Sequence, residues 1–233
     1  MTQLKFYETL SARGLELNEK QKAQFYDFFK LLVDWNSRMN LTGITKEHEV
    51  YAKHFFDSLD PFLDIDLSNT TSICDVGTGA GFPGMPLAIA YPDIQFDLID
   101  SLGKRIDFLT HCANELELKN VRASHIRAEE FAQVKRESFG LVTSRAVARL
   151  NILIELCAPL LKIDGKLVVL KGPAGTEELQ EAKNGIHLLG LSQGEVKTAS
   201  HHAGERVNIY FNKIKQTPKK YPRQFGQIKK KPL

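Results

Sequence analysis

The sequence predicts an α/β protein with a mostly parallel sheet and helices on both faces. From residue 71 onward, short apolar runs of strand length alternate with amphipathic stretches of helical length. The first of these runs ends in a glycine-rich turn that leads directly into a helix, as in a βαβ unit. Hydrophobic residues at 42% and charged residues at 25% lie near globular averages, which argues against a disordered or coiled-coil chain.

Two helices are expected before the sheet. The first follows a capping-box pair, Asn18 and Gln21. Its apolar residues recur at helical spacing: Phe25, Phe28, Leu32, Trp35 and Met39. The second begins after Thr45 and ends before Pro61, with an apolar face of Val50, Phe55 and Leu59. We expect both apolar faces to pack in the core, so that residues 1–66 form a helical extension of the main domain.

The alternating part continues to residue 215 and forms the main domain, 67–215. Strands are expected at 71–76, 94–100, 120–126, 139–146 and 165–172. The helices between them are expected at 83–91, 104–118, 128–134 and 150–162. A further helix near 176–189 precedes a closing antiparallel pair at 195–200 and 206–214. Residues 216–233 remain as a basic C-terminal tail.

Cysteine spacing and hydropathy bear on the cellular compartment. The three cysteines, Cys74, Cys112 and Cys157, have neither metal-site nor CxxC spacing, so we expect no metal and a reducing compartment. The N-terminus lacks the apolar run of a signal peptide, and no stretch approaches the roughly 18 apolar residues of a membrane span. The expectation is a cytoplasmic protein with no membrane partner.

Positive charge is concentrated at the C-terminus. Residues 213–233 carry eight Lys or Arg and no Asp or Glu, which leaves 23 basic and 28 acidic groups elsewhere. An acidic body with a basic end indicates a polyanionic partner such as a nucleic acid, or alternatively a tail that only keeps the protein soluble. Composition alone leaves both interpretations open.

The glycine-rich turn is the strongest site signal. It runs from Asp75 to Gly84 and contains Gly77, Gly79 and Gly81. Glycines at a strand-to-helix turn permit positive φ and let a ligand lie against bare backbone. Residues 79–84 satisfy the GxGxxG pattern of nicotinamide-binding folds, yet counted from Gly77 the third glycine position is Phe82. A nicotinamide-dependent oxidoreductase is therefore an alternative, but its glycine pattern is out of register with the strand-to-helix turn.

The turn resembles the D/E-x-G-x-G-x-G loop of the Rossmann-like S-adenosylmethionine-dependent methyltransferases. This resemblance implies that Asp75, Gly77 and Gly79 bind S-adenosylmethionine, and an acidic residue before the glycines suits the cationic part of that molecule. Asp100 ends the next strand, 23 residues beyond Gly77, where an acceptor for ribose hydroxyls belongs in both cofactor families. The alternative role for Asp100 is to cap the long helix that follows.

Ala128 and Glu129 follow the third strand and should reach the same edge of the sheet. In the methyltransferases that this chain resembles, the corresponding turn contacts adenine. Glu129 has a simpler alternative, because an acidic residue in the first turn of a helix is favoured by the helix dipole.

The end of the fourth strand limits the chemistry. It reads Thr143-Ser144-Arg145-Ala146, without the Asn/Asp-Pro-Pro-aromatic tetrad of enzymes that methylate exocyclic amines, and Cys157 lies inside an expected helix rather than in a nucleophile motif. A nitrogen with a free lone pair, such as guanine N7, needs only alignment and a suitable electrostatic surface. Arg145 and Lys171, at the ends of two strands, are the candidate catalytic residues, although Arg145 could instead form a surface or interdomain salt bridge.

The whole chain then resembles the bacterial small-subunit ribosomal RNA guanine-N7 methyltransferase family (RsmG, also called GidB). The matching segments are residues 40–44, 54–59, 75–84, 100–105, 144–146, 170–172, 204–206 and 221–223. The family implies methyl transfer from S-adenosylmethionine to N7 of a 16S rRNA guanosine. Carried over by position, its cofactor contacts would be Gly77, Phe82, Ala128, Glu129 and Arg145. Residues 224–228 depart from the family's usual pattern.

With this resemblance, RNA becomes the expected partner of the basic residues, as 16S rRNA or the small ribosomal subunit. The candidate RNA-binding residues are Lys104, Arg105, Arg206, Lys219, Lys220 and Arg223, and Lys171 is expected on the same edge. In the tail, Tyr221 and Phe225 would add stacking surfaces for unpaired RNA. The protein is expected to act as a monomer. An RNA-binding assembly factor without turnover, or a methyltransferase for another substrate, are the remaining alternatives.

Overall fold

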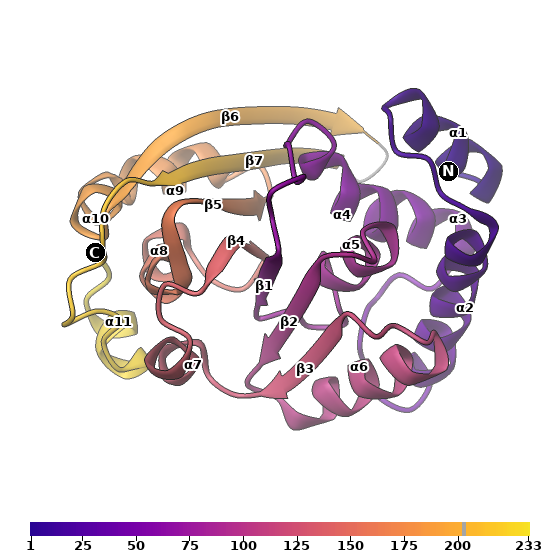
Figure 1. The fold of residues 1–233 in the computed structure, drawn as a ribbon, viewed down its shortest axis with the longest axis horizontal. Coiled ribbons are helices and arrows are strands. Elements are labelled where there is room, and N and C mark those ends of the chain that lie inside the picture. Colours follow the sequence, from indigo (N-terminus) through magenta and orange to yellow (C-terminus); the bar gives the residue numbers. More distant parts are fainter. Residues whose placement is uncertain (202–203) are drawn as a thin grey trace.

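The strands form one mixed sheet, and the computed structural model describes residues 1–201 and 204–233 (Figure 1). In the described residues the sheet has seven strands in the order β3-β2-β1-β4-β5-β7-β6. Their bounds are β1 Ser72–Val76, β2 Gln95–Asp100, β3 Val121–His125, β4 Phe139–Arg145, β5 Leu161–Lys171, β6 Leu191–His201 and β7 Gly204–Lys213. Only the pairs of β7 with β5 and with β6 are antiparallel. The predicted fold class, with its closing antiparallel pair, is confirmed.

The strand order contains a switch point at β1. From β1 the chain moves outward to β2 and β3, and then returns to place β4 on the other side of β1. The carboxyl ends of these parallel strands therefore share one edge, the site edge, with Val76, Asp100, His125 and Arg145 as last residues. Ligands of open parallel sheets bind outside such an edge.

Helices cover both faces of the sheet (Figure 1). Those before β4 are α1 Gln3–Ala12, α2 Glu19–Asn36, α3 Glu47–Val50, α4 Asp57–Leu59, α5 Gly84–Ala90, α6 Gly103–Glu115 and α7 Ala128–Val134. Those after it are α8 Leu150–Cys157, α9 Gly175–Glu181, α10 Lys183–Leu188 and α11 Phe225–Lys230. A π-helical turn, Tyr51–Phe56, joins α3 to α4, and short 3-10 turns cover Asp60–Phe62 and Ala158–Leu160.

Each face of the sheet has its own core. Side chains alternate between faces along a strand, so Ile73 of β1 packs with α1, α2, α5 and α6, whereas its neighbour Cys74 packs with the helices from α7 to α10. The first core contains the N-terminal aromatic residues, including Phe6, Phe25 and Phe55. The helical extension and the sheet thus share one apolar core.

The N-terminal helices differ in part from the prediction. The capping box is present, since Asn18 Oδ1 accepts from Gln21 N and Gln21 Oε1 accepts from Asn18 N, both at 2.9 Å. However, α2 ends at Asn36 and not at Met39, and α3 begins after Lys46 without the expected Thr45 cap. The sequence did not predict α1, because only Phe6 and Leu10 of its ten residues are buried.

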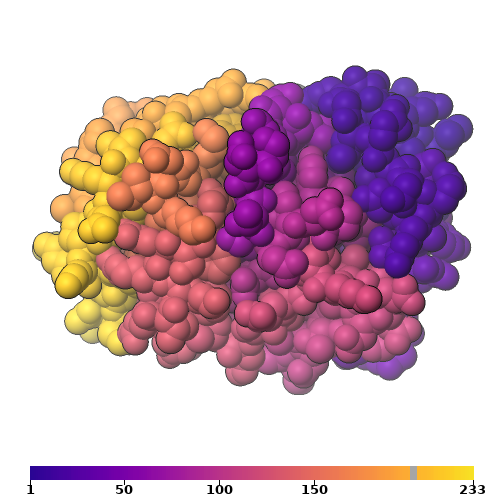
Figure 2. Space-filling model, viewed as in Figure 1, coloured from indigo at the N-terminus to yellow at the C-terminus, as the bar shows by residue number. Residues whose placement is uncertain are grey.

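The C-terminal segment, described from the sequence as a basic tail, is packed against the domain. Thr217, Tyr221 and Ile228 are buried, and Arg136 donates hydrogen bonds to the carbonyl oxygens of Thr217 and Tyr221. The segment lies at the opposite end of the molecule from the N-terminal helices (Figure 2). In the described ranges, we find no helix that combines the length and the apolar character needed to span a membrane.

Candidate cofactor and substrate site

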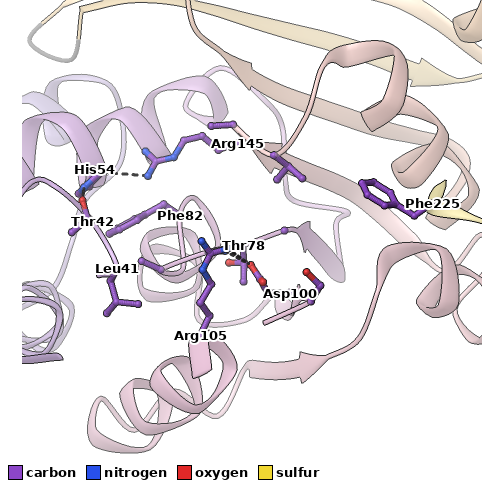
Figure 3. A pocket seen from close by; sticks show the side chains of 15 residues that line it. Leu41, Thr42, His54, Thr78, Phe82, Asp100, Arg105, Arg145 and Phe225 are labelled. Atoms are coloured by element: carbon purple, nitrogen blue, oxygen red, sulfur yellow. Dashed lines mark hydrogen bonds and ion pairs between the residues drawn. The ribbon is translucent and has the colours of Figure 1, made fainter. Parts of the chain in front are cut away.

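The site edge is hollowed by a cavity of about 490 Å³ (Figure 3). Its walls come from the glycine turn, the turn after β2, the end of β4 and the segment between α2 and α3. The side chains that Figure 3 labels are Leu41, Thr42, His54, Thr78, Phe82, Asp100, Arg105, Arg145 and Phe225. The glycine turn and Asp100 therefore meet at one cavity, as the sequence predicted.

Asp75 holds the two ends of the glycine turn together. Its Oδ2 accepts from Thr78 Oγ1 at 2.7 Å and from the backbone N–H of Gly84 at 2.9 Å. Gly77, directly before Thr78, has φ of 68°, and a Cβ there would be 2.4 Å from Val147 Cγ2, so only glycine fits. The turn therefore keeps its backbone open toward the cavity.

The second oxygen of the Asp75 carboxylate is buried without a hydrogen-bond partner among the described residues, so a nearby positive charge would stabilise its ionised form. Asp75 is fully buried, and its Oδ1 has no hydrogen-bond partner among the described residues. Burial raises the pKa of Asp75 to about 6 because the ionised form is poorly solvated there, against the hydrogen bonds from Thr78 and Gly84. A cationic ligand group nearby would stabilise the carboxylate, which fits the charge of S-adenosylmethionine.

Asp100 connects the glycine turn to the turn after β2. Its Oδ2 accepts from Gly79 N at 3.0 Å and Arg105 Nη1 at 3.2 Å, and its Oδ1 accepts from Leu102 N at 2.9 Å. The N-cap of α6 is Leu102, so the alternative of Asp100 as the helix N-cap is wrong. A carboxylate offers about four acceptor positions, which leaves one that a ribose hydroxyl could use.

A second, smaller cavity of about 130 Å³ opens beside the first. It is lined by Ala128 and Glu129 at the start of α7 and shares Gly77 and Asp100 with the larger cavity. Glu129 is buried in the first turn of α7. The structure thus brings together the predicted ribose and adenine positions. Phe225, from the C-terminal segment, lines both cavities.

Phe82 carries two partners on its ring. The imidazole of His54 stacks on it, with ring centroids 4.5 Å apart and planes 16° apart, and the guanidinium carbon of Arg145 lies 4.9 Å from the ring centroid. Phe82 is itself buried. The aromatic residue that replaces the third glycine of a nicotinamide loop therefore anchors one wall of the cavity.

His54 is fixed in one neutral tautomer. Arg145 Nη2 lies 3.3 Å from His54 Nδ1, and because a guanidinium can only donate, Nδ1 must be the acceptor. His54 Nε2 then carries the proton and donates to Thr42 Oγ1 at 2.8 Å. Burial, aided by the charge of Arg145, lowers the pKa of His54 to about 3. The ring is neutral at physiological pH.

Asp57 joins two arginines next to this wall. Arg145 Nη1 lies 3.2 Å from its Oδ2, and Arg206 Nε lies 2.8 Å from its Oδ1. These three side chains line a third cavity of about 330 Å³, which His54 also lines. The salt bridge considered for Arg145 exists, but it is internal and orients the guanidinium at the boundary of two cavities.

Lys171 does not reach the glycine-turn cavity, contrary to the expectation that it flanks the reaction with Arg145. It lines the third cavity, and its Nζ pairs with Glu178 Oε2 at 2.7 Å and donates to Ala148 O at 2.7 Å. Glu178 also accepts from the backbone N–H of Leu150, at the start of α8. Lys171 therefore holds the chain after β4 and has no free path to a substrate in the larger cavity.

The candidate RNA-binding residues fall into separate places. Lys104 and Arg105 lie at the site edge on α6, and Arg206 lies there on Asp57. Lys219 and Lys220 are exposed, but they follow the end of β7, which pairs with the middle of β5 at Lys166, away from the site edge. The structure therefore does not bring these two lysines to the cavities.

Two further basic residues of the C-terminal segment have partners within the protein. Arg223 forms an ion pair with the buried Glu155, through Nε to Oε1 at 2.8 Å and through Nη2 to Oε2. This ion pair neutralises the buried carboxylate and fastens Arg223 to α8, and the contact of Arg223 with RNA stays a prediction. Lys213, counted with the basic end, is fully buried and donates to Ala158 O at 2.7 Å.

Sequence reasoning missed four residues of the site: Thr42, His54, Asp57 and Phe225. The first three lie in segments that match the family, yet neither helical spacing nor charge assigned them a role. His54 and Asp57 lie in and just after the π-helical turn, a feature often found at functional sites. Phe225, which the sequence led us to expect as a stacking surface for RNA, lines both cavities.

The family model described as GidB, rRNA small subunit methyltransferase G, matches residues 21–208. Ribosomal RNA small subunit methyltransferase G of Staphylococcus aureus (strain JH9) is 51% identical over 229 residues, covering 97% of this chain and 96% of the relative. The protein of the same name from Staphylococcus haemolyticus is 51% identical over 227 residues, with 96% and 95% covered. Both alignments extend beyond the family match, to nearly the full chain.

Solved structures at lower identity share the fold. A cofactor-bound protein from MTB has a TM-score of 0.60 at 14% identity, over 80% of this chain and 89% of that chain. A SAM-dependent O-methyltransferase from Thermotoga maritima has a TM-score of 0.54 at 15% identity, over 81% and 73%. A 16S rRNA adenine methyltransferase from Catenulisporales acidiphilia has a TM-score of 0.55 at 13% identity, over 64% and 87%. With the glycine turn, the two carboxylates and this similarity together, the chain is a member of the GidB family of rRNA small subunit methyltransferases.

Proposed function

We propose that this protein transfers a methyl group from S-adenosylmethionine to N7 of a guanosine in 16S rRNA. The observation that carries the proposal is the meeting of three features at one cavity: the open glycine turn, the buried carboxylate of Asp100 and the Phe82–Arg145 wall. The second buried carboxylate, Asp75, lies behind the turn and accepts a hydrogen bond from Thr78, which lines the cavity. The names of the Staphylococcus relatives support the small-subunit rRNA as substrate.

The cofactor contacts follow from the distribution of charge along the edge. Asp100, with one acceptor position left, would bind the ribose hydroxyls, and Ala128 and Glu129 would border the adenine in the smaller cavity. Gly77 and Gly79 would present backbone to the methionine part, close to the buried Asp75. When bound, S-adenosylmethionine supplies an electrophilic methyl group.

The target nitrogen needs alignment rather than deprotonation. Guanine N7 has a lone pair free for attack, and the cavity is consistent with this: His54 is neutral with both nitrogens engaged, and Asp75 and Asp100 hold backbone groups. We therefore propose that catalysis rests on the position of the base against the Phe82 wall, without a general base.

Arg145 is the proposed catalytic residue, because its guanidinium borders the larger cavity and is held there by Asp57 and His54. A guanidinium can pair with the edge of a purine or with phosphate. Lys171 takes a different part in this proposal. Through Ala148 and Glu178 it positions the loop between Arg145 and α8, so we class it as a positioning residue.

RNA would approach the site edge, where Lys104, Arg105 and Arg206 lie. Cations at such an edge contact phosphates, while the target base enters the cavity unpaired. All residues of the proposed site come from one chain, and we propose a monomer that acts in the cytoplasm on the small ribosomal subunit or on its naked RNA.

The experiment is methyl transfer from labelled S-adenosylmethionine to small subunits and naked 16S rRNA from a strain that lacks this gene. Nucleoside mass spectrometry should then find 7-methylguanosine from one site. Arg145→Lys should lower the yield while binding of the cofactor persists, because a point charge cannot replace the planar contact. Binding of the cofactor without transfer to either substrate would contradict the proposal and favour an assembly factor.

A further inference from the structure

Phe225 reaches the cofactor cavities from a part of the chain far from the glycine turn. It begins α11 and lines both the larger and the smaller cavity, together with Gly77, Asp100 and Val147. Figure 3 shows its ring on the opposite side of the larger cavity from Leu41 and Thr42. The C-terminal segment therefore completes a wall that the methyltransferase sheet leaves open.

The smaller cavity has the character of a pocket for a flat, mostly apolar ring. Ile99, Ile126, Val147 and Leu156 give it aliphatic walls, and its polar side chains are Asp100, Ser101, Arg127 and Glu129. Of the described residues that line it, Phe225 is the one with an aromatic ring. Aromatic rings bind nucleobases by stacking or edge contacts, independently of the base's hydrogen bonds.

Phe225 is held in place by contacts on both sides of it. Arg223, two residues before, is fixed to Glu155 of α8 by its side chain and by its backbone N–H, at 2.9 Å. Arg223 Nη2 also donates to Lys231 O at 3.0 Å, which ties the two ends of α11 together. Ile228 is fully buried one turn after Phe225. The ring is thus carried on an anchored element and not on a loose tail.

We propose that Phe225 is a cofactor-binding residue whose ring closes the smaller cavity against the adenine of S-adenosylmethionine. The inference rests on the proposed placement of adenine beside Ala128 and Glu129. It assigns the segment from Arg223 to Ile228 a role in holding the cofactor, in place of the RNA stacking that the sequence suggested.

The test is calorimetry of purified full-length protein with two ligands, S-adenosylmethionine and 5′-methylthioadenosine, which lacks the amino-acid part. Phe225→Ala should weaken both ligands by the same factor, about tenfold, because base–aromatic contacts are of that order. Phe225→Tyr should bind nearly as the wild type, and Phe225→Leu should fall between the two. Gln227→Ala, exposed on the same helix, is the matched control and should leave both affinities unchanged.

The outcomes separate this inference from the proposed function. If the wild type binds both ligands and Phe225→Ala binds them with the same affinity, the proposed role of Phe225 is overturned and the methyltransferase proposal is left intact. A loss for S-adenosylmethionine but not for 5′-methylthioadenosine would overturn it as well, since the contact would not be with the base. Failure of the wild type to bind either ligand would instead contradict the proposed cofactor site. If Phe225→Ala unfolds at a lower temperature than the wild type, the affinities of Phe225→Leu and Phe225→Tyr are compared instead. Weaker binding of both ligands by Phe225→Leu than by Phe225→Tyr supports the role of the ring, and equal binding overturns it.

Discussion

The imidazole of His54 lies parallel to the ring of Phe82, with centroids 4.5 Å apart and an interplanar angle of 16°. This contact joins the π-helical turn of the N-terminal extension to the glycine turn of the sheet. Arg145, from the end of β4, contacts both rings. The extension therefore supplies one wall of the site, and its role is not limited to packing against the core.

His54 should make the protein less stable in acid. Its pKa in the folded protein is about 3, below the ordinary value of 6.5, so the unfolded chain takes up a proton that the folded protein excludes. Stability should fall as the pH drops below 6.5, and the His54 contribution at pH 5 is a loss of about 2 kcal/mol. Urea unfolding of His54→Gln at pH 7.5 and pH 5 should show a smaller difference than the wild type. His187→Gln, at an exposed position, should lose as much stability between pH 7.5 and pH 5 as the wild type. An equal loss of stability in all three proteins would exclude the role of His54.

Asp75 should make both stability and cofactor affinity depend on pH, and its effect on stability is opposite in sense to that of His54. Its folded pKa of about 6 lies above the ordinary value of 3.8, so burial of the charge reduces the stability of the cofactor-free protein as the pH rises from 4 to 6. A cationic ligand favours the ionised form, and its affinity should decline as the pH falls below about 6. Asp75→Asn should raise the melting temperature at pH 7.5, weaken S-adenosylmethionine and remove this pH dependence. A variant that loses both stability and affinity would show that the carboxylate is mainly structural.

Loss of the Asp100 charge should weaken the cofactor without unfolding the sheet. Charge-assisted hydrogen bonds are worth about 1.5–3 kcal/mol, so Asp100→Ala should lower S-adenosylmethionine affinity by about 10- to 100-fold, and Asp100→Asn should lie nearer the lower figure. Calorimetry is the measurement. Asp97→Asn, on the same strand but outside the cavities described above, is the control. Unchanged affinity in Asp100→Ala would mean that the carboxylate only fastens Gly79 and Leu102.

The sheet was predictable because its signals are local. Each strand is a short apolar run, and the glycine turn and Asp100 follow strands that the topology rules place side by side. Helix α1 was not predicted because two buried residues in ten give no clear helical periodicity. The end of α2 was predicted three residues too late because Met39 continues the helical spacing of the apolar residues.

The positions of two predicted site residues depend on long-range pairing that the sequence does not show. Arg223 has the same charge as its lysine neighbours, and only the buried Glu155, 68 positions earlier, turns it into an internal ion pair. Lys171 is likewise recruited by Glu178 and Ala148. Composition counts charges, but it does not tell which of them the fold has already neutralised.

Salt dependence of RNA binding should distinguish the two groups of exposed cations. Each phosphate contact contributes a slope of about 0.7 to log affinity against log salt for single-stranded RNA. Besides Lys104, the exposed Arg127 lies at the site edge, where it is the N-cap residue of α7 and lines the smaller cavity. The double variant Lys104→Gln, Arg127→Gln removes these two charges, so the slope should become shallower by about 1.4. The double variant Lys219→Gln, Lys220→Gln, away from the site edge, should leave the slope as it is.

The measurement is fluorescence anisotropy with a labelled 16S rRNA fragment from about 50 to 200 mM salt, the range over which such contacts change affinity strongly. Point substitutions are the better test than a deletion of residues 216–233, because a deletion would remove the buried side chains of Tyr221 and Ile228. If the slope becomes shallower in the Lys219 and Lys220 variant and stays unchanged in the Lys104 and Arg127 variant, RNA is bound by the C-terminal segment and not by the site edge. RNA would then follow the C-terminal segment around the domain, as the charge distribution of the sequence first suggested.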